Sequence, residues 1–314
     1  MPLSRLLRMK AEFFHPSCKL WCMTLEQLRI FVAVAEREYL TQGARVLNLT
    51  QSAVSSAITT LEARYATKLF DRIGRRIVLT EAGQLFLIEA RAVLARAAAA
   101  EAVLSDLSGL ARGSLTLMAS QTVANYWLPP LIQRFHREHP GIAVSLAIGN
   151  TETVSAAIHD GAADLGFIEG EIDAPSLDMT EVDEDELVIV VPTGHPWAAA
   201  APSTQELSGG AWVLREAGSG TRAMFEAALP GLGLGADDLT VALELPSNEA
   251  ICAAVASGAG ATTISRLVAA NAIAAGRLAT VALPLPRRRF LALRHRERYL
   301  AKAAAAFLAL CQGG

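Results

Sequence analysis

The sequence predicts a protein of three consecutive parts: an all-α head with a helix-turn-helix and a small β-wing, one long helix, and an α/β body of two lobes. Three observations carry this prediction. Apolar residues recur at helical spacing from Met23 onward, residues 84–111 repeat apolar positions without a proline, and strand-like and helix-like segments alternate after Gly113. We therefore divide the chain into residues 23–82, 83–112 and 113–314.

Composition supports packed domains and shows where a charged partner would bind. Of 314 residues, 52% are hydrophobic and 19% charged, which suits folded cores, and no apolar run is long enough for a transmembrane helix. Four cysteines are too few and too scattered for a disulfide framework (Cys18, Cys22, Cys252, Cys311). Residues 23–80 carry a net charge of +3, whereas residues 113–314 carry -8. A basic front and an acidic back indicate a polyanionic partner for the front.

Residues 1–22 show neither periodicity nor the pattern of a signal peptide. Cys18 and Cys22 have no nearby histidine or cysteine cluster that would suggest a metal or redox site. We expect a disordered extension or an upstream start, with Met23 as the natural first residue, and exclude the segment from the fold.

The head begins with three short helices. Thr24 and Gln27 form a capping-box pattern, and Thr50 is the expected N-cap of the third helix, after a break at Asn48-Leu49-Thr50. The apolar positions expected in the core are Leu28, Phe31, Val32, Ala35, Ala44, Leu47, Val54, Ile58 and Leu61. Two helices joined by a short turn indicate a helix-turn-helix, although three apolar-faced helices occur in many globular proteins.

The side chains that this spacing leaves exposed to solvent favour nucleic-acid binding. The third helix exposes small hydrogen-bonding side chains that can reach base edges, and arginines flank Gly74 in an alternating segment typical of a β-wing, where they would contact phosphates. The expected DNA-binding residues are Thr50, Gln51, Ser52, Ser55, Ser56, Thr59, Arg72, Arg75 and Arg76.

The long helix carries a heptad-like seam with small central residues, which predicts a dimerisation helix. The seam consists of Phe86, Ala90, Val93, Ala97, Ala100, Leu104 and Leu107. The alternative is an alanine-rich helix that only covers its own domain.

In the body, two sets of strands alternate with helices, which predicts mainly parallel sheets in two lobes around a cleft. The expected strands are 114–119, 143–148, 164–168, 187–191, 212–214, 240–245 and 261–264. Several are followed by small polar residues at a helix start, an arrangement that suits a small anion because helix N-termini offer free N–H groups. Ordinary helix capping is the alternative for each of them.

The segments Leu49-Thr50-Gln51-Ser52-Ala53-Val54-Ser55, Leu69-Phe70-Asp71-Arg72 and Leu79-Thr80-Glu81-Ala82-Gly83 closely resemble the winged helix-turn-helix of LysR-type transcriptional regulators. The resemblance implies pairing through the long helix, dimers that pair into tetramers, and an effector domain with the fold of periplasmic solute-binding proteins. It also implies chain crossings near 169–185 and 283–289, hence one lobe of 113–184 and 286–314 and another of 185–285. This chain departs from the family in having Gln42-Gly43-Ala44, where Arg-Ala-Ala is usual, and fewer arginines on the third helix.

The body resembles the branch that contains regulators of sulfur assimilation, sulfite response and carbon fixation, through Ala119-Ser120-Gln121-Thr122, Leu165-Gly166-Phe167-Ile168-Glu169 and Gly218-Ser219-Gly220-Thr221-Arg222. This implies an anionic effector, with a sulfur oxyanion such as sulfite first and a phosphorylated metabolite second. The expected effector contacts are Ser120, Gln121, Thr122, Thr151, Glu169, Ser219, Thr221, Arg222 and Asn248. Arg222 is a candidate countercharge, although it and Arg215 could equally form surface or inter-lobe salt bridges.

Enzymatic function is not supported, because the six histidines match no catalytic or metal-ligand spacing and no nucleophile elbow occurs. We expect no catalytic residues, cofactor or metal. The acidic run 183–186 is interpreted as a solvated turn, and Arg287-Arg288-Arg289 as a surface loop. The sequence therefore predicts a cytoplasmic DNA-binding regulator with double-stranded DNA, an anionic effector and further copies of itself as partners, RNA polymerase as a further candidate, and no membrane. The alternative is a solute-binding or catalytic α/β protein with an incidental helical head.

Overall fold

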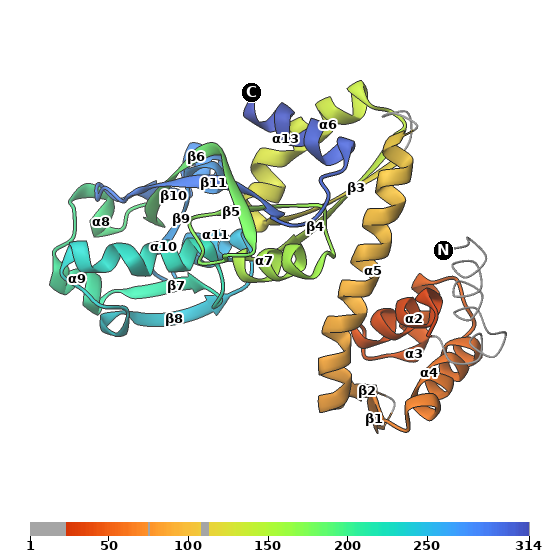
Figure 1. Ribbon diagram of the computed structural model, residues 1–314. Coiled ribbons are helices and arrows are strands. Elements are labelled where there is room, and N and C mark those ends of the chain that lie inside the picture. Colours follow the sequence, from red (N-terminus) through yellow and green to blue (C-terminus); the bar gives the residue numbers. More distant parts are fainter. Residues whose placement is uncertain (1–22, 75, 108–112, 314) are drawn as a thin grey trace, which may run out of the picture. The chain divides into compact units, whose positions relative to one another are not determined.

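The computed structural model describes residues 23–74, 76–107 and 113–313 (Figure 1). It divides into two compact units, Met1–Ala97 and Ala98–Gly314. The extension expected at 1–22 lies outside the described residues. None of the described helices is long and apolar enough to cross a membrane.

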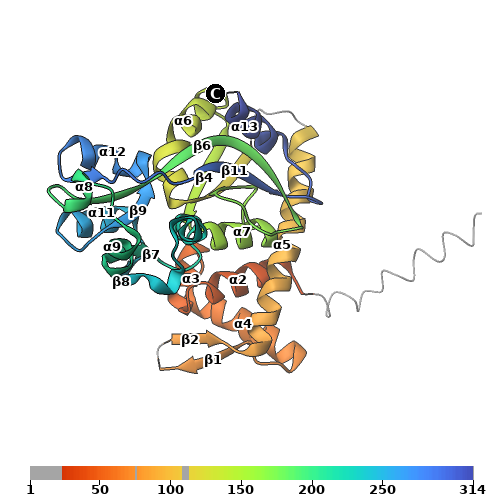
Figure 2. The same cartoon turned by 90° about the vertical axis from the view of Figure 1, so that its left-hand side faces the viewer.

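The head consists of three helices and a β-hairpin, as the sequence predicts. Its elements are α2 (Leu25–Ala35), α3 (Leu40–Val46), α4 (Gln51–Tyr65), β1 (Phe70–Ile73) and β2 (Arg76–Leu79). The hairpin strands are antiparallel and lie beside α4 in Figure 2. Gly74 at the hairpin tip has a φ of +63°, a conformation that a glycine adopts without strain.

The predicted caps are confirmed. Thr24 accepts a hydrogen bond from the Gln27 backbone N–H and returns one through its own N–H, and Thr50 accepts from the Ala53 N–H at 3.2 Å. Asn48 has a φ of 54°, a left-handed conformation that asparagine tolerates better than most residues, and this explains the break between α3 and α4.

Close packing explains Gly43, where the sequence departs from the family pattern. A Cβ at this position would lie 2.8 Å from Cγ2 of Val34, so α2 and α3 approach too closely for alanine without a shift. The core beneath them centres on Phe31, whose ring lies 5.3 Å from that of Phe70 and 4.8 Å from that of Phe86.

The long helix is α5 (Glu81–Leu107). Its first half belongs to the head core through Phe86 and Ala90, so these two seam residues pack inside their own domain. Val93, Ala100 and Leu104 are exposed, and Leu85, Ile88 and Val103 form further exposed apolar positions that the seam omits. The side chain of Leu107 lies outside the described part of the chain.

The first lobe of the body combines an early stretch of chain with a late one. Its elements are β3 (Gly113–Ser120), η2 (Val123–Trp127), α6 (Leu128–Glu138), β4 (Ile142–Gly149), α7 (Thr151–Asp160), β5 (Leu165–Glu169), part of β6 (Leu177–Pro192), β11 (Arg287–His295) and α13 (Lys302–Gln312). The strand order is β4-β3-β5-β11-β6. The ring of Phe307 on α13 packs against Phe135 and Phe167 in its core.

The second lobe is continuous in sequence between β6 and β11. It contains α8 (Pro196–Ala199), α9 (Thr204–Gly209), β7 (Ala211–Arg215), α10 (Gly220–Ala228), η3 (Leu229–Leu232), η4 (Ala236–Asp238), β8 (Thr240–Leu245), α11 (Asn248–Ala256), β9 (Thr262–Ser265), α12 (Arg266–Ala274) and β10 (Leu278–Thr280). The far half of β6 pairs with β9 and β10, so this strand serves both lobes.

Three predictions about the body are wrong. The large sheet is mixed rather than mainly parallel, because β6 and β11 run antiparallel to the strands beside them, whereas the small β7–β8 sheet is parallel. The acidic run 183–186 is no turn but part of β6, which starts ten residues before the predicted strand at 187. Arg287-Arg288-Arg289 is no surface loop but the start of β11. The two runs are paired in register, with Arg288 opposite Asp185, so the charges of one strand balance those of the other.

Candidate functional site

The outward face of α4 carries the predicted polar side chains. Gln51, Ser52, Ser56 and Thr59 are exposed and Ser55 is half-buried. Val54, Ile58 and Leu61 on the opposite face are buried in the head core. The Thr50 hydroxyl is engaged as the N-cap and lies 3.1 Å from the hydroxyl of Ser52. The helix therefore presents short donors and acceptors at its N-terminal end, the end that contacts base edges in helix-turn-helix proteins.

The wing is fastened to the turn between α2 and α3, a contact that sequence reasoning missed. Arg76 donates from Nε to the Tyr39 hydroxyl at 2.7 Å, and its guanidinium lies 5.6 Å from the centre of the Tyr39 ring. The Ile77 N–H donates to the Glu38 carbonyl. Arg72 is exposed, and Arg75 lies outside the described residues. Tyr39 therefore holds one of the predicted phosphate-binding arginines in place.

A buried carboxylate fixes the base of the wing. Glu62 accepts hydrogen bonds from the backbone N–H groups of Leu69 and Phe70 at 2.9 and 3.2 Å, and from Lys68 Nζ at 2.9 Å. Burial by itself raises the pKa of Glu62, but these hydrogen bonds outweigh it, and the pKa is lowered from its ordinary value of 4.5. The ionised form therefore ties α4 to the first wing strand.

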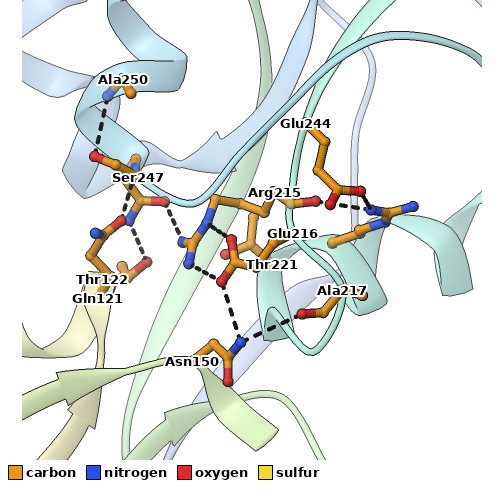
Figure 3. Close-up of polar contacts among 12 residues, drawn as sticks. Gln121, Thr122, Asn150, Arg215, Glu216, Ala217, Thr221, Glu244, Ser247 and Ala250 are labelled. Atoms are coloured by element: carbon orange, nitrogen blue, oxygen red, sulfur yellow. Dashed lines mark hydrogen bonds and ion pairs between the residues drawn. The ribbon is translucent and has the colours of Figure 1, made fainter. Parts of the chain in front are cut away.

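In the body, predicted effector residues meet across the two lobes. Figure 3 shows Gln121 and Thr122 of the first lobe facing the start of α11 in the second. The Asn248 N–H donates to Gln121 Oε1 at 2.6 Å, and Asn248 Nδ2 donates to Thr122 Oγ1 at 3.2 Å. Asn248 is fully buried, and its Oδ1 accepts from Arg215 Nη1 at 2.8 Å. These bonds hold the lobes together at the point where the sequence predicts an effector.

A second set of contacts joins the lobes around the glycine-rich turn. Asn150 donates to Glu216 Oε1 at 3.3 Å, and Glu216 accepts from Arg215 Nε at 2.8 Å (Figure 3). Burial tends to raise the pKa of Glu216, but the hydrogen bonds from Arg215 and Asn150 outweigh it, and the pKa is lowered. A Cβ on Gly220 would lie 2.5 Å from Thr151 Oγ1, so this glycine permits close approach of the lobes.

Two buried hydroxyls near this contact lack hydrogen-bond partners. Ser120 Oγ and Thr151 Oγ1 are inaccessible to solvent and unpaired within the described residues. Ser120 lies opposite Gly149 in the parallel β3–β4 pair, and Thr151 follows Gly149 at the start of α7. Both hydroxyls thus lie at the carboxyl edge of one sheet, which is where ligands bind in α/β folds.

A buried arginine that the sequence analysis assigned to the surface occupies the crossing between the lobes. The side chain of Arg288 is inaccessible to solvent, and its Nε donates to Asp185 Oδ2 at 2.7 Å. Its Nη1 donates to the Thr221 hydroxyl at 2.9 Å and lies 3.5 Å from Glu169 Oε1. Thr221 and Glu169 therefore belong to a charged cluster around Arg288. In the sequence, the acidic run 183–186 and the basic run 287–289 are complementary in charge, and this was the pattern that could have predicted the cluster.

The predicted countercharge Arg222 is engaged elsewhere. Its Nε donates to Glu226 Oε1 at 2.7 Å, and its Nη1 donates to Glu244 Oε2 and to the Arg215 carbonyl. The structure does not bring Arg222 to the two unpaired hydroxyls. No cluster of histidine, cysteine, aspartate and glutamate suited to a metal ion occurs among the described residues.

Both parts of the chain match family models. Residues 25–84 match the model described as bacterial regulatory helix-turn-helix protein, lysR family, and residues 108–314 match the LysR substrate binding domain. The Escherichia coli HTH-type transcriptional regulator YeiE is 36% identical over 291 residues, covering 92% of this chain and 97% of that protein. CysL of Bacillus subtilis is 32% identical, covering 78% and 82%.

Solved structures share the fold. The full-length LysR family regulator CbnR in complex with its target DNA aligns with a TM-score of 0.64 at 20% identity, covering 93% of this chain and 99% of that one. The regulatory domain of Synechocystis CcmR in complex with 2-PG aligns with a TM-score of 0.59 at 26% identity, covering 64% and 97%.

Proposed function

The chain belongs to the LysR family of DNA-binding transcriptional regulators, and on this premise we propose that a small anion bound between the lobes controls how the head engages DNA. One observation carries the proposal. Beside the N-terminus of α7, the hydroxyls of Ser120 and Thr151 are buried and have no hydrogen-bond partner among the described residues. Hydroxyls at such a position are suitable donors for an oxyanion.

Charge favours a sulfur oxyanion such as sulfite. Arg215, Arg222 and Arg288 each pair with carboxylates, so none of these guanidiniums is left over for the ligand. A site made of neutral donors suits a small anion of low charge better than a phosphate monoester. A phosphorylated metabolite is the second candidate, because the related CcmR domain was solved with 2-PG.

For control, the anion must bind one arrangement of the lobes better than another. The hydrogen bonds of Asn248 to Gln121 and Thr122 join the two lobes directly, and we call this the closed arrangement. An anion that accepts hydrogen bonds from the hydroxyls of Ser120 and Thr151 would satisfy both groups in the closed arrangement and so stabilise it. Ser219 at the start of α10 is a further candidate contact, since a Cβ on the neighbouring Gly220 would lie 2.5 Å from Thr151 Oγ1. The Thr221 hydroxyl, by contrast, is bound to Glu169 and Arg288.

We further propose that α4 and the wing bind DNA as the sequence predicts, and that exposed apolar positions of α5 pair two copies. Val93, Ala100 and Leu104 of the predicted seam remain available for such pairing, with Leu85 and Ile88 as additional candidates. Tetramers and contact with RNA polymerase are extensions of this proposal. A dimer would hold two heads at a fixed spacing for two half-sites.

The anion is tested by calorimetry of the full chain with sulfite, thiosulfate, sulfate and 2-PG. We expect sulfite to bind, and Ser120→Ala combined with Thr151→Val to weaken it at least tenfold. Thr151→Ser keeps the hydroxyl and should retain most of the affinity, and Ser145→Ala on the exposed side of β4 is the matched control. Unchanged sulfite binding in the double variant would remove these hydroxyls from the site.

DNA contacts are tested by mobility shift on a series of operator variants. We expect Arg75→Ala to weaken binding to every sequence alike and to reduce its salt dependence, whereas Gln51→Ala or Ser55→Ala alters sequence preference. Arg137→Ala on α6 is the control for charge. A change of preferred sequence in Arg75→Ala alone would contradict the assignment of roles.

A further inference from the structure

A large cavity opens beside the contact between the lobes. It has a volume of about 1190 Å³ and is lined by α7 and the turn 170–176 of the first lobe, by α10 of the second, and by the start of β11. Ala156, Ala223 and Met224 give it an apolar wall. Ser120 and Asn248 are not part of its lining, so it is distinct from the site proposed for the anion, although Thr151 and Ser219 border both.

The charges around this cavity are predominantly negative. Five carboxylates and three guanidiniums line it. The guanidiniums are already neutralised, because Arg287 pairs with Glu184, Arg288 with Asp185, and Arg289 with Glu171 and Glu181. No partner for the carboxylates of Glu152 and Asp173 is found in the part of the chain that the structure describes. The cavity therefore has an excess of acceptors and of negative charge.

Glu169 shows where a positive group is missing. Its side chain is 2% exposed, and Oε1 accepts from the Thr221 hydroxyl at 3.3 Å. Oε2 is buried and has no hydrogen-bond partner among the described residues. Around Arg288, the two carboxylates of Glu169 and Asp185 face a single guanidinium, so this cluster has one negative charge too many. A buried carboxylate oxygen in this position calls for a donor that carries a positive charge.

We propose that the cavity binds an aliphatic diamine or polyamine. One ammonium group pairs with Glu169 Oε2, and its N–H donors supply the missing hydrogen bonds. The methylene chain lies along Ala156, Ala223 and Met224, and a second ammonium group pairs with Glu152 or Asp173. A ligand here touches α7 of one lobe and α10 of the other, so its binding is coupled to lobe closure. The proposal does not depend on the anionic effector.

Calorimetry of the full chain with putrescine, cadaverine and spermidine tests this. We expect saturable binding with one site per chain, at least tenfold weaker binding of n-butylamine, and none of succinate. Glu169→Gln should weaken putrescine binding at least tenfold, whereas Glu138→Gln on the exposed face of α6 should leave it unchanged.

Because Glu169→Gln also alters the contacts of Thr221 and Arg288, a second variant fills the cavity instead. Ala223 is exposed in the cavity wall, and Ala223→Leu should weaken putrescine binding without changing the thermal unfolding temperature. Absence of saturable diamine binding, equal binding of putrescine and n-butylamine, or wild-type affinity in both variants would each overturn the proposal.

Discussion

The head and the region between the lobes are built on opposite principles. The head is held by an apolar core around Phe31 and, with the exception of the buried Glu62, keeps the polar side chains of α4 and the wing outside. The inter-lobe region buries charged and amide groups instead, with Arg288 and Asn248 both closed to solvent. Apolar burial tolerates small displacements, whereas buried polar groups depend on specific partners. We therefore expect the head to keep one conformation, and the inter-lobe region to change its hydrogen bonds when a ligand binds.

We expect the largest effect from a substitution that breaks the buried charge cluster around Arg288. Arg288→Met should lower the free energy of unfolding of the body by about 3–5 kcal/mol, because it leaves Asp185 and Glu169 buried without their cation. Denaturant unfolding of the full chain at neutral pH measures this.

Arg287→Met is the matched control for that loss. The side chain of Arg287 is 74% exposed, and its pair with Glu184 is open to solvent, so we expect a change below about 0.5 kcal/mol. Equal stability of the two variants would show that the cluster does not hold the lobes.

Substitution of alanine for one glycine in the head and one between the lobes compares the rigidity of the two regions. A Cβ on Gly83 would lie 2.1 Å from the Leu69 carbonyl oxygen in the head, and one on Gly220 would lie 2.6 Å from the Glu169 carbonyl oxygen between the lobes. Gly83→Ala should destabilise the head by about 1–3 kcal/mol, because its neighbours belong to one closed core. Gly220→Ala can be relieved by parting of the lobes, so it should cost less stability.

Two measurements separate these outcomes. Denaturant unfolding gives the stability of each variant, and hydrogen exchange reports opening of amides at the start of α10. We expect faster exchange there, and weaker sulfite binding, in Gly220→Ala alone. If both variants lose stability equally and exchange is unchanged, the lobes are as rigid as the head.

The smallest expected effect concerns pH. The pKa values of Glu62 in the head and Glu216 between the lobes are both lowered, so each contributes stability above its ordinary pKa of 4.5 that is lost as the pH falls through its folded value. Glu62→Gln should cost the head about 1 kcal/mol at pH 7 and remove part of its acid sensitivity. Glu216→Gln should leave the head unchanged and speed amide exchange at the start of α7.

Both are followed by hydrogen exchange and denaturant unfolding between pH 7 and pH 3. Glu26→Gln on the exposed start of α2 is the control, since this carboxylate forms an open pair with Arg29. An acid sensitivity of the head that is the same in Glu62→Gln and wild type would contradict the role of the buried carboxylate.

The sequence predicted the head well because its signals are local. Each cap bonds to a residue three positions along the chain, Thr24 to Gln27 and Thr50 to Ala53. The buried positions Val54, Ile58 and Leu61 lie within two turns of α4. In the sequence Gly43 is only a departure from the family pattern, because its role in close packing depends on Val34 in another helix. Tyr39 was missed for the same reason, since Arg76 is 37 residues away.

The body was predicted less well because its decisive contacts are distant in sequence. Aspartate and glutamate are poor strand formers, so residues 183–186 resemble a turn until the arginines of β11 are placed beside them. Arg288 donates to a carboxylate 103 residues away. The Gly218-Ser219-Gly220 turn was predicted to contact the effector. In the structure, at least Gly220 is needed for the close approach of the two lobes.

The place of β11 in the first lobe affects how the chain folds as it is synthesised. Strands β3, β4 and β5 leave the ribosome early, but β11 lies between β5 and β6 in their sheet, and Phe307 of α13 completes their core. The first lobe therefore cannot complete its fold until the second lobe, which is continuous in sequence, has been synthesised. A nascent chain halted before residue 287 would expose the unfinished core of one lobe beside a complete second lobe, a state that proteases and chaperones can recognise.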